Sequence, residues 1–202
     1  EIIENGPYII KNLEKVTGSK NTESEDKEVM ALCRCGASKN KPFCDGAHVS
    51  TGFSGKKERK EKHETNEFAG KEITVLDNAG ICCHAGECVG GAPEVFFSRE
   101  GNKRVSNPDK GDKEKVIRTI TKCPSGSLAY KIDDELYDEY FSEEEIFIAK
   151  DGPLHIRGGI ELDDDSGKEL ISREHYTLCR CGASRNKPFC DGTHKIINFG
   201  EN

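Results

Sequence analysis

Cysteine and histidine occur together twice in this chain in nearly the same sixteen-residue pattern. The first copy, CRCGASKNKPFCDGAH, runs from Cys33 to His48, and the second, CRCGASRNKPFCDGTH, runs from Cys179 to His194. Each copy places three cysteines and one histidine at the spacing C-x-C-x8-C-x3-H. Three thiolates and one imidazole form a complete four-ligand set for a soft metal centre.

The spacing indicates how each copy would present its ligands. Alternate side chains of an extended segment share a face, so Cys33 and Cys35 can bind one metal ion together. Cys44 and His48 are four residues apart and can meet on one side of a helical turn, with Asp45 as a side-chain cap at its entry. Two ligands from a loop and two from a turn favour a two-iron cluster. A single zinc ion and a disulfide framework are the alternatives.

This motif resembles the CDGSH iron–sulfur family of the mitoNEET type, whose pattern is C-x-C-x2-(S/T)-x3-P-x-C-D-G-(S/A/T)-H. Both copies match every position of that pattern. The resemblance implies a β-rich dimer with one [2Fe-2S] cluster in each half. The ligands that it implies are Cys33, Cys35, Cys44 and His48 in the first copy, and Cys179, Cys181, Cys190 and His194 in the second.

A third group of cysteines lies between the two copies. Cys82, Ala85 and Cys88 occupy a C-x2-C-x2-C frame in which alanine replaces the middle cysteine, and Cys123 follows a segment with helical spacing, Asp112–Thr121. The arrangement resembles divergent single-cluster bacterial ferredoxins. That resemblance implies one more cluster, bound by Cys82, Cys88 and Cys123.

The missing middle cysteine leaves the type of this cluster open. Three thiolates suit a [3Fe-4S] cluster, which lacks the fourth iron, and this is our prediction. A [4Fe-4S] cluster would need a substitute ligand, and Cys83 or His84 is adjacent in the sequence. Cys83 could equally be a small buried apolar residue, and His84 an ordinary polar residue near the cluster.

The composition limits the class of protein. Of the 202 residues, 34% are hydrophobic and 33% are charged, so we expect a small hydrophobic core. Metal clusters would then be needed to stabilise the fold. All ten cysteines fall inside the three groups, which favours metal binding in a reducing compartment over secreted disulfides. The sequence shows neither a secretory signal nor an apolar run long enough to span a membrane. We therefore expect a cytoplasmic protein, or one of an organelle matrix if a transit peptide was removed.

The repeat extends beyond the motif. A shift of 146 residues places Asn5-Gly6-Pro7 over Asp151-Gly152-Pro153 and predicts matching strands at Tyr8–Lys11 and Leu154–Arg157. Polar loops are expected at 17–28 and 161–168, and a further strand at Glu72–Leu76. The predicted fold is α+β: a β-rich pseudo-dimer of two internal repeats, with a small ferredoxin-like α+β domain between them. The predicted units are 1–53, a charged linker at 54–67, 68–145 and 146–202.

These expectations lead to a multi-cluster electron carrier and not an enzyme. The alternatives are an iron–sulfur cluster donor or a redox or pH sensor that uses labile histidine-ligated clusters, and a subunit of a redox enzyme. The net charge of −7 argues against nucleic acid and suits docking onto basic redox partners. The expected partners are a reductase, an electron acceptor or an apo-acceptor protein. We expect a monomer that does not bind membranes.

Overall fold

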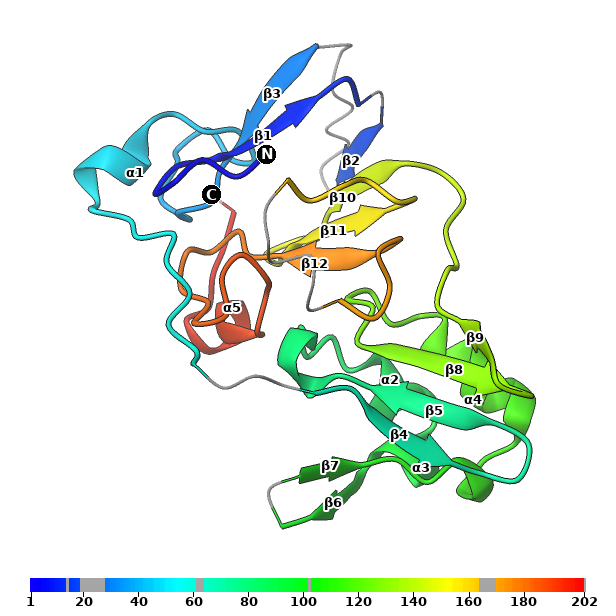
Figure 1. Ribbon diagram of the computed structural model, residues 1–202. Helices are drawn as coiled ribbons and strands as arrows, with labels where there is room; N and C mark the ends of the chain where they lie inside the picture. Colours follow the sequence, from blue (N-terminus) through cyan, green and yellow to red (C-terminus); the bar gives the residue numbers. More distant parts are fainter. Residues whose placement is uncertain (14, 19–27, 61–63, 102, 164–169, 202) are drawn as a thin grey trace.

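The computed structural model describes residues 1–13, 15–18, 28–60, 64–101, 103–163 and 170–201. It is an α+β structure in which short strands predominate over a few short helices (Figure 1). Three parts are distinguished below: the first repeat (residues 1–53), the middle domain (residues 66–140) and the second repeat (residues 145–201). Among the described residues, no helix has the length and apolar character needed to cross a membrane.

The first repeat is built on a two-stranded antiparallel sheet. Strand β1 (Tyr8–Lys11) pairs with β3 (Val29–Leu32), and the short helix α1 (Ala47–Ser50) follows the loop after β3. The predicted strand at Tyr8–Lys11 is confirmed. Asn5 has a φ of 52° in the turn before β1, where a short polar side chain tolerates the left-handed conformation.

The second repeat follows the same plan. Strands β10 (Glu145–Ile148), β11 (Leu154–Arg157) and β12 (Tyr176–Leu178) form an antiparallel sheet, and α5 (Thr193–Ile196) corresponds to α1. The predicted strand at Leu154–Arg157 is confirmed. The loop predicted at 161–168 lies largely outside the described residues, which resume at residue 170.

One strand passes from the first repeat to the second. Strand β2 (Val16–Gly18) pairs in parallel with β10 and completes a sheet of order β12-β11-β10-β2. The prediction of a polar loop starting at residue 17 was therefore wrong at its beginning, and residues 19–27 lie outside the described part. The apolar side chain of Val16 is buried in the shared core, which explains why this segment joins a sheet.

The two repeats bury one common hydrophobic core. Tyr8 and Leu32 of the first repeat pack in the same cluster as Ile146, Ile156 and Phe189 of the second. The Tyr8 hydroxyl donates to the carbonyl oxygens of Cys179, at 2.8 Å, and Pro188, at 3.2 Å. The pseudo-dimer is thus held together by apolar burial and by a buried phenol that crosses between the repeats.

The middle domain has its own sheet and core. Strands β4 (Asn66–Ala69), β5 (Thr74–Asp77), β8 (Leu128–Ile132) and β9 (Glu135–Tyr137) form an antiparallel sheet in that order. The strand expected at Glu72–Leu76 begins two residues later, at Thr74. Helix α4 (Lys113–Ile120) confirms the helical spacing, with the Asp112 side chain accepting the N–H of Lys115 as its N-cap.

The remaining elements of the middle domain are short and surround its cysteines. They are the 3₁₀ turns η1 (Ala79–Ile81) and η2 (Pro108–Lys110), the helices α2 (Glu87–Gly91) and α3 (Pro93–Phe96), and the hairpin β6 (Ser98–Glu100) and β7 (Lys103–Val105). Val95, Val116 and Ile120 are fully buried in a core separate from that of the repeats. This core positions the loop Cys82–Cys88 against Cys123.

Candidate iron–sulfur sites

In the first repeat the four expected ligands meet as two pairs. The Sγ atoms of Cys33 and Cys35 are 3.8 Å apart, and Cys44 Sγ is 3.5 Å from Nδ1 of His48. Two sulfur ligands at about 2.3 Å from one tetrahedral metal lie about 3.8 Å apart, and a sulfur and an imidazole nitrogen about 3.5 Å. Each pair therefore has the separation of two ligands on one metal ion.

The second repeat reproduces this geometry. Cys179 and Cys181 are 3.7 Å apart through their Sγ atoms, and Cys190 Sγ is 3.3 Å from Nδ1 of His194. Within the described residues, no group of three or more His, Cys, Asp or Glu side chains converges on a single metal position. The four expected ligands of each copy are thus arranged as two separate pairs.

Local hydrogen bonds shape the turn that carries each cysteine–histidine pair. In the first repeat, Asp45 accepts the backbone N–H of Lys39 at 2.8 Å and of Ala47 at 3.0 Å, which lowers the pKa of its carboxyl. The N–H of Gly46 points to the sulfur of Cys44 at 3.4 Å. Asp191, Arg185 and Gly192 repeat these contacts in the second repeat. Amide donors near sulfur favour a metal-bound thiolate.

The arginine between the first two cysteines of each copy is part of the site, although the sequence reasoning assigned it no role. Arg34 donates to the carbonyls of Ile3 and Gly55, and Arg180 to those of Gly152 and Ala149. Both are buried. Each arginine holds the Cys-Arg-Cys segment to the turn at the start of its own repeat, and Arg34 also holds it to the segment that follows the first repeat at Gly55. The presence of arginine at the same position in both copies was the available signal.

The ligands expected in the middle domain line a cavity of about 300 Å³. Cys82, Cys88 and Cys123 all contribute to its wall, and so does Ala85 at the position of the missing cysteine. The hydroxyl oxygen of Ser127 lies 3.5 Å from the sulfur of Cys123. The three expected ligands of the middle domain therefore share the wall of one cavity.

Arg104 supports this cavity and was not found from the sequence. Its Nη1 donates to the sulfur of Cys82 at 3.2 Å, and its Nε donates to Asp77 at 2.6 Å. Burial raises the pKa of Asp77, and the guanidinium beside it opposes that shift. A cation beside a cluster sulfur stabilises the thiolate form. Arg104 is far from Cys82 in the sequence and reaches it only through the β6–β7 hairpin.

Both candidates for a fourth ligand, Cys83 and His84, also line the cavity. Cys83 is buried, and burial raises the pKa of its thiol to about 12. His84 has a left-handed backbone, with φ at 54°, and burial lowers the pKa of its imidazole. An imidazole kept neutral is ready to bind a metal. Cys83 and His84 therefore line the same cavity as Ala85, which has no side-chain atom that could act as a fourth ligand.

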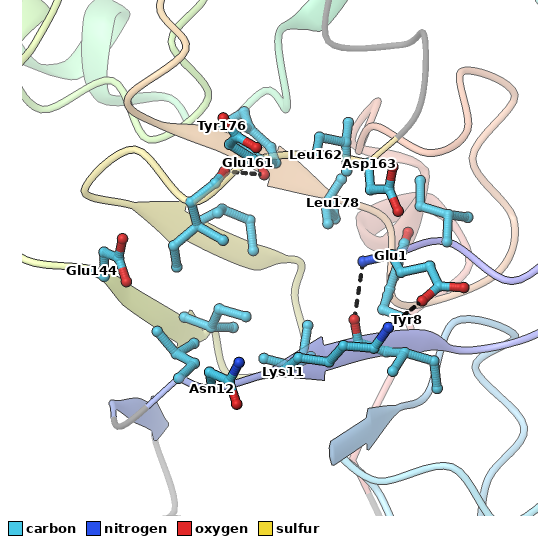
Figure 2. A pocket seen from close by; sticks show the side chains of 17 residues that line it. Glu1, Tyr8, Lys11, Asn12, Glu144, Glu161, Leu162, Asp163, Tyr176 and Leu178 are labelled. Carbon is cyan, nitrogen blue, oxygen red and sulfur yellow. Dashed lines mark hydrogen bonds and ion pairs between the residues drawn. The ribbon is translucent and has the colours of Figure 1, made fainter. Parts of the chain in front are cut away.

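A larger cavity, of about 940 Å³, lies between β1 and the sheet of the second repeat (Figure 2). No described residue of its wall is a cysteine or histidine, and the wall includes apolar residues of the shared core, with Lys11 paired to Glu1 at its rim.

Comparison with known families agrees with this division of the chain. Residues 5–49 and 151–195 each match the family described as iron-binding zinc finger, CDGSH type. The chain belongs to the CDGSH iron-binding family. Residues 68–133, between the two CDGSH segments, match the family described as divergent 4Fe-4S mono-cluster. Both resemblances and the α+β pseudo-dimer layout are confirmed, and the protein is an iron–sulfur protein.

Curated relatives cover parts of this CDGSH protein. It is 38% identical over 64 residues to the uncharacterized protein YjdI of Escherichia coli K12, a match that spans 32% of this chain and 82% of that protein. YjdI of Escherichia coli O157:H7 matches equally. The mouse CDGSH iron-sulfur domain-containing protein 3, mitochondrial, is 47% identical over 32 residues, which is 16% of this chain and 23% of that protein. No solved structure matches significantly.

Proposed function

We propose that this protein is an electron carrier with two [2Fe-2S] clusters and one cubane-type cluster. The observation that carries the proposal is the contact between the middle site and the second CDGSH site. A Cβ atom placed on Gly192 would lie 3.1 Å from the Cβ of His84 and 3.3 Å from the carbonyl oxygen of Cys83. The ligand turn of one site therefore packs directly on the cysteine loop of another, which gives electrons a short path between them.

The ligand sets support a carrier more than an enzyme. Catalytic metal sites keep one coordination position open for a substrate, whereas structural and electron-transfer sites are closed. At each CDGSH site the two pairs of protein ligands fill the outer positions of a two-iron cluster. Such a cluster takes up and releases one electron at a time. The chain supplies the ligands, amide donors to sulfur, and buried walls that keep water from Cys190 and His194.

For the middle site we propose Cys82, Cys88 and Cys123 as ligands of a [3Fe-4S] cluster. The absence of a thiol at Ala85 supports the three-iron form. A [4Fe-4S] cluster, which the description of the matching family names, is the alternative and would take Cys83 or His84 as its fourth ligand. Both residues line the cavity beside the three cysteines, which supports the alternative.

The test is to quantify the iron in the protein and then to reduce and reoxidise its clusters repeatedly. Anaerobically purified protein should contain about seven irons with a three-iron middle cluster, or about eight with a four-iron one. The clusters should be reduced by dithionite and reoxidised repeatedly without loss of iron, as followed by absorbance and EPR. Stoichiometric zinc in a colourless protein would overturn the assignment. Release of iron in the first redox cycle would overturn the carrier role.

Cluster donation or sensing is a second candidate, favoured by one observation. Cys44 and His48 are only partly buried, whereas Cys190 and His194 are buried, so the first site is within reach of an acceptor. Transfer of an intact [2Fe-2S] cluster to an apo-ferredoxin, with a chelator present to trap free iron, would support this reading. For either role we propose a monomer in a reducing compartment, the cytoplasm or an organelle matrix, with redox proteins or apo-acceptors as partners.

A further inference from the structure

The two CDGSH turns have almost the same sequence but are covered unequally. In the second repeat, Cys190 is 3% exposed and His194 is 8% exposed, whereas Cys44 and His48 are intermediate in exposure. Asn186 is buried and its counterpart Asn40 is exposed. Since the local sequences match, the difference arises from what packs against each turn.

The middle domain covers the second turn through a small set of contacts. The side-chain amide of Asn186 donates to the carbonyl of Gly80 at 2.7 Å, and Nζ of Lys195 donates to the carbonyl of His84 at 2.6 Å. Gly192, which has no side chain, lets the backbone beside His84 approach closely. These three residues form a face that binds carbonyl groups of the cysteine loop and of the η1 turn that precedes it in the ferredoxin-type domain.

The first repeat presents the same face uncovered. Asn40, Gly46 and Val49 are the counterparts of Asn186, Gly192 and Lys195 under the shift of 146 residues. The backbone is alike in the two copies. The N–H of Asn40 donates to Ser38 at 3.0 Å, as that of Asn186 does to Ser184, and φ is 87° at Gly46 and 81° at Gly192.

This face is open within the described part of the chain. No described atom lies within 4 Å of a Cβ built on Gly46, and Val49 is 78% exposed. Helix α1 projects from the side of the molecule away from the middle domain, whereas α5 adjoins it (Figure 1). The loop of the middle domain is already bound to the second repeat, so a second copy of this chain cannot supply the occupant without giving up that contact.

We infer that Asn40, Gly46 and Val49 form a docking face for the cysteine loop of a separate ferredoxin-type iron–sulfur protein, which exchanges electrons with the first CDGSH site. The inference rests on the proposed carrier function and names its partner class. The second repeat is the precedent, because the same backbone and the same side-chain amide there already bind the cysteine loop and the turn before it. The partner loop differs at one point: it meets the apolar Val49 where the chain's own loop meets Lys195. One electron passes between the two clusters, and no atoms are transferred.

A matched pair of variants tests the face. Val49 in α1 and Ile196 in α5 are 78% and 81% exposed, so Val49→Glu and Ile196→Glu add the same charge at similar exposure. The probe is a reduced bacterial single-cluster [4Fe-4S] ferredoxin, whose cysteine loop is of the same type as the chain's own, mixed with the oxidised holoprotein in a stopped-flow instrument. We expect Val49→Glu to lower the second-order rate constant by about tenfold, as loss of a central contact does. Ile196→Glu should stay close to the wild type.

Two further measurements make the result decisive. Asn40→Asp removes the amide donor at an exposed position and should also slow electron exchange with the ferredoxin. This second variant tests the face independently if Val49→Glu disturbs the neighbouring cluster. Reduction by a small viologen, which needs no docking face, should be equal in all variants. If viologen reduces the clusters and both face variants match Ile196→Glu, or if the ferredoxin does not react with the wild type, the docking face is wrong. If viologen itself cannot reduce the clusters, the carrier function fails first.

Discussion

At the scale of single residues, the histidine ligands make the CDGSH sites sensitive to acid. A histidine binds a metal through an unprotonated nitrogen, so protons compete with iron, whereas iron-bound thiolates resist protonation. Burial lowers the pKa of His194, and the positive charge of Lys195 adds to the effect. A lowered pKa keeps the imidazole of His194 neutral down to a lower pH. The second site should therefore retain its histidine ligand at a pH where an exposed histidine, with its ordinary pKa near 6.5, would already be protonated.

We predict that acid releases both CDGSH clusters before the middle cluster. Replacing His48 and His194 together with cysteine should slow the loss of [2Fe-2S] absorbance below about pH 6, near the ordinary histidine pKa. The reason is the sign of the competition: as the pH falls, the imidazole gains a proton and leaves the iron, while a thiolate ligand remains bound. The absorbance decay is measured after pH jumps. Equal decay in the double variant and the wild type would contradict the prediction.

A second prediction at this scale concerns Ala85. Ala85→Cys should convert the middle cluster from three irons to four, because Ala85 lines the cavity at the frame position where a full cubane has a thiolate. With added iron and reductant, the EPR signal of the oxidised three-iron cluster should fade and a reduced four-iron signal appear.

The competing assignment for the middle cluster has its own signature. If the wild type lacks the three-iron signal when oxidised anaerobically, and Cys83→Ala or His84→Ala creates it, then Cys83 or His84 already fills the fourth corner. In that case the three-iron prediction is wrong and the four-iron alternative holds.

At the scale of elements, the two repeats meet backbone to backbone. Cys35 and Cys181 form an isolated antiparallel β-bridge between the repeats. The glycines that follow them, Gly36 and Gly182, have positive φ angles of 78° and 77°. A Cβ on Gly182 would lie 2.3 Å from the carbonyl oxygen of Cys35, and one on Gly36 would lie 2.4 Å from that of Cys181. Only glycine allows this approach, which holds the two cysteine pairs on either side of the pseudo-dimer axis.

We predict that Gly182→Ala lowers the free energy of unfolding by about 2–4 kcal/mol, because the backbone strain adds to a clash that a carbonyl group cannot avoid. Circular dichroism during chemical unfolding measures the loss. Gly90→Ala is the control, since no described atom lies within 4 Å of a Cβ there and alanine favours the helix. Equal stability of the two variants would show that the bridge between the repeats is not a close contact in solution.

At the scale of the whole molecule, the inserted domain makes a symmetric pair of sites unequal. The second site is enclosed by the middle domain and the linker, in which the N–H groups of Glu58 and Arg59 donate to the carbonyl of Arg185. The first site faces outward. Two clusters with the same ligands should therefore differ in accessibility and in the rate at which they lose iron.

We predict that a chelator removes the [2Fe-2S] clusters in two phases of equal amplitude, with the first site in the fast phase. Asn186→Ala should accelerate the slow phase by about tenfold, because it removes the 2.7 Å hydrogen bond to the buried carbonyl of Gly80, which keeps only the longer 3.3 Å bond from Arg59, and so loosens the interface. Asn40→Ala, the matched control in the first repeat, should change neither phase. Visible absorbance follows both phases, and a single phase in the wild type would contradict the asymmetry.

What the sequence determined by itself was local. The strand bounds at Tyr8–Lys11 and Leu154–Arg157 and the helix capped by Asp112 followed from turn residues and apolar spacing over a few positions. Cys44 and His48 meet as predicted, but not on one helical turn, because α1 begins only at Ala47 and Gly46 before it has a left-handed φ of 87°. These features depend on neighbours in the chain, so a sequence pattern is enough to find them.

What only the tertiary structure decided involves residues far apart in the chain. Val16–Gly18 joins the sheet of the second repeat, Arg104 reaches the sulfur of Cys82, and Asn186 holds the loop at Gly80. No local pattern encodes these contacts, since each depends on which surfaces are buried together when the two cores form. The same physical cause makes one of two nearly identical motifs an interior site and leaves the other open at the surface.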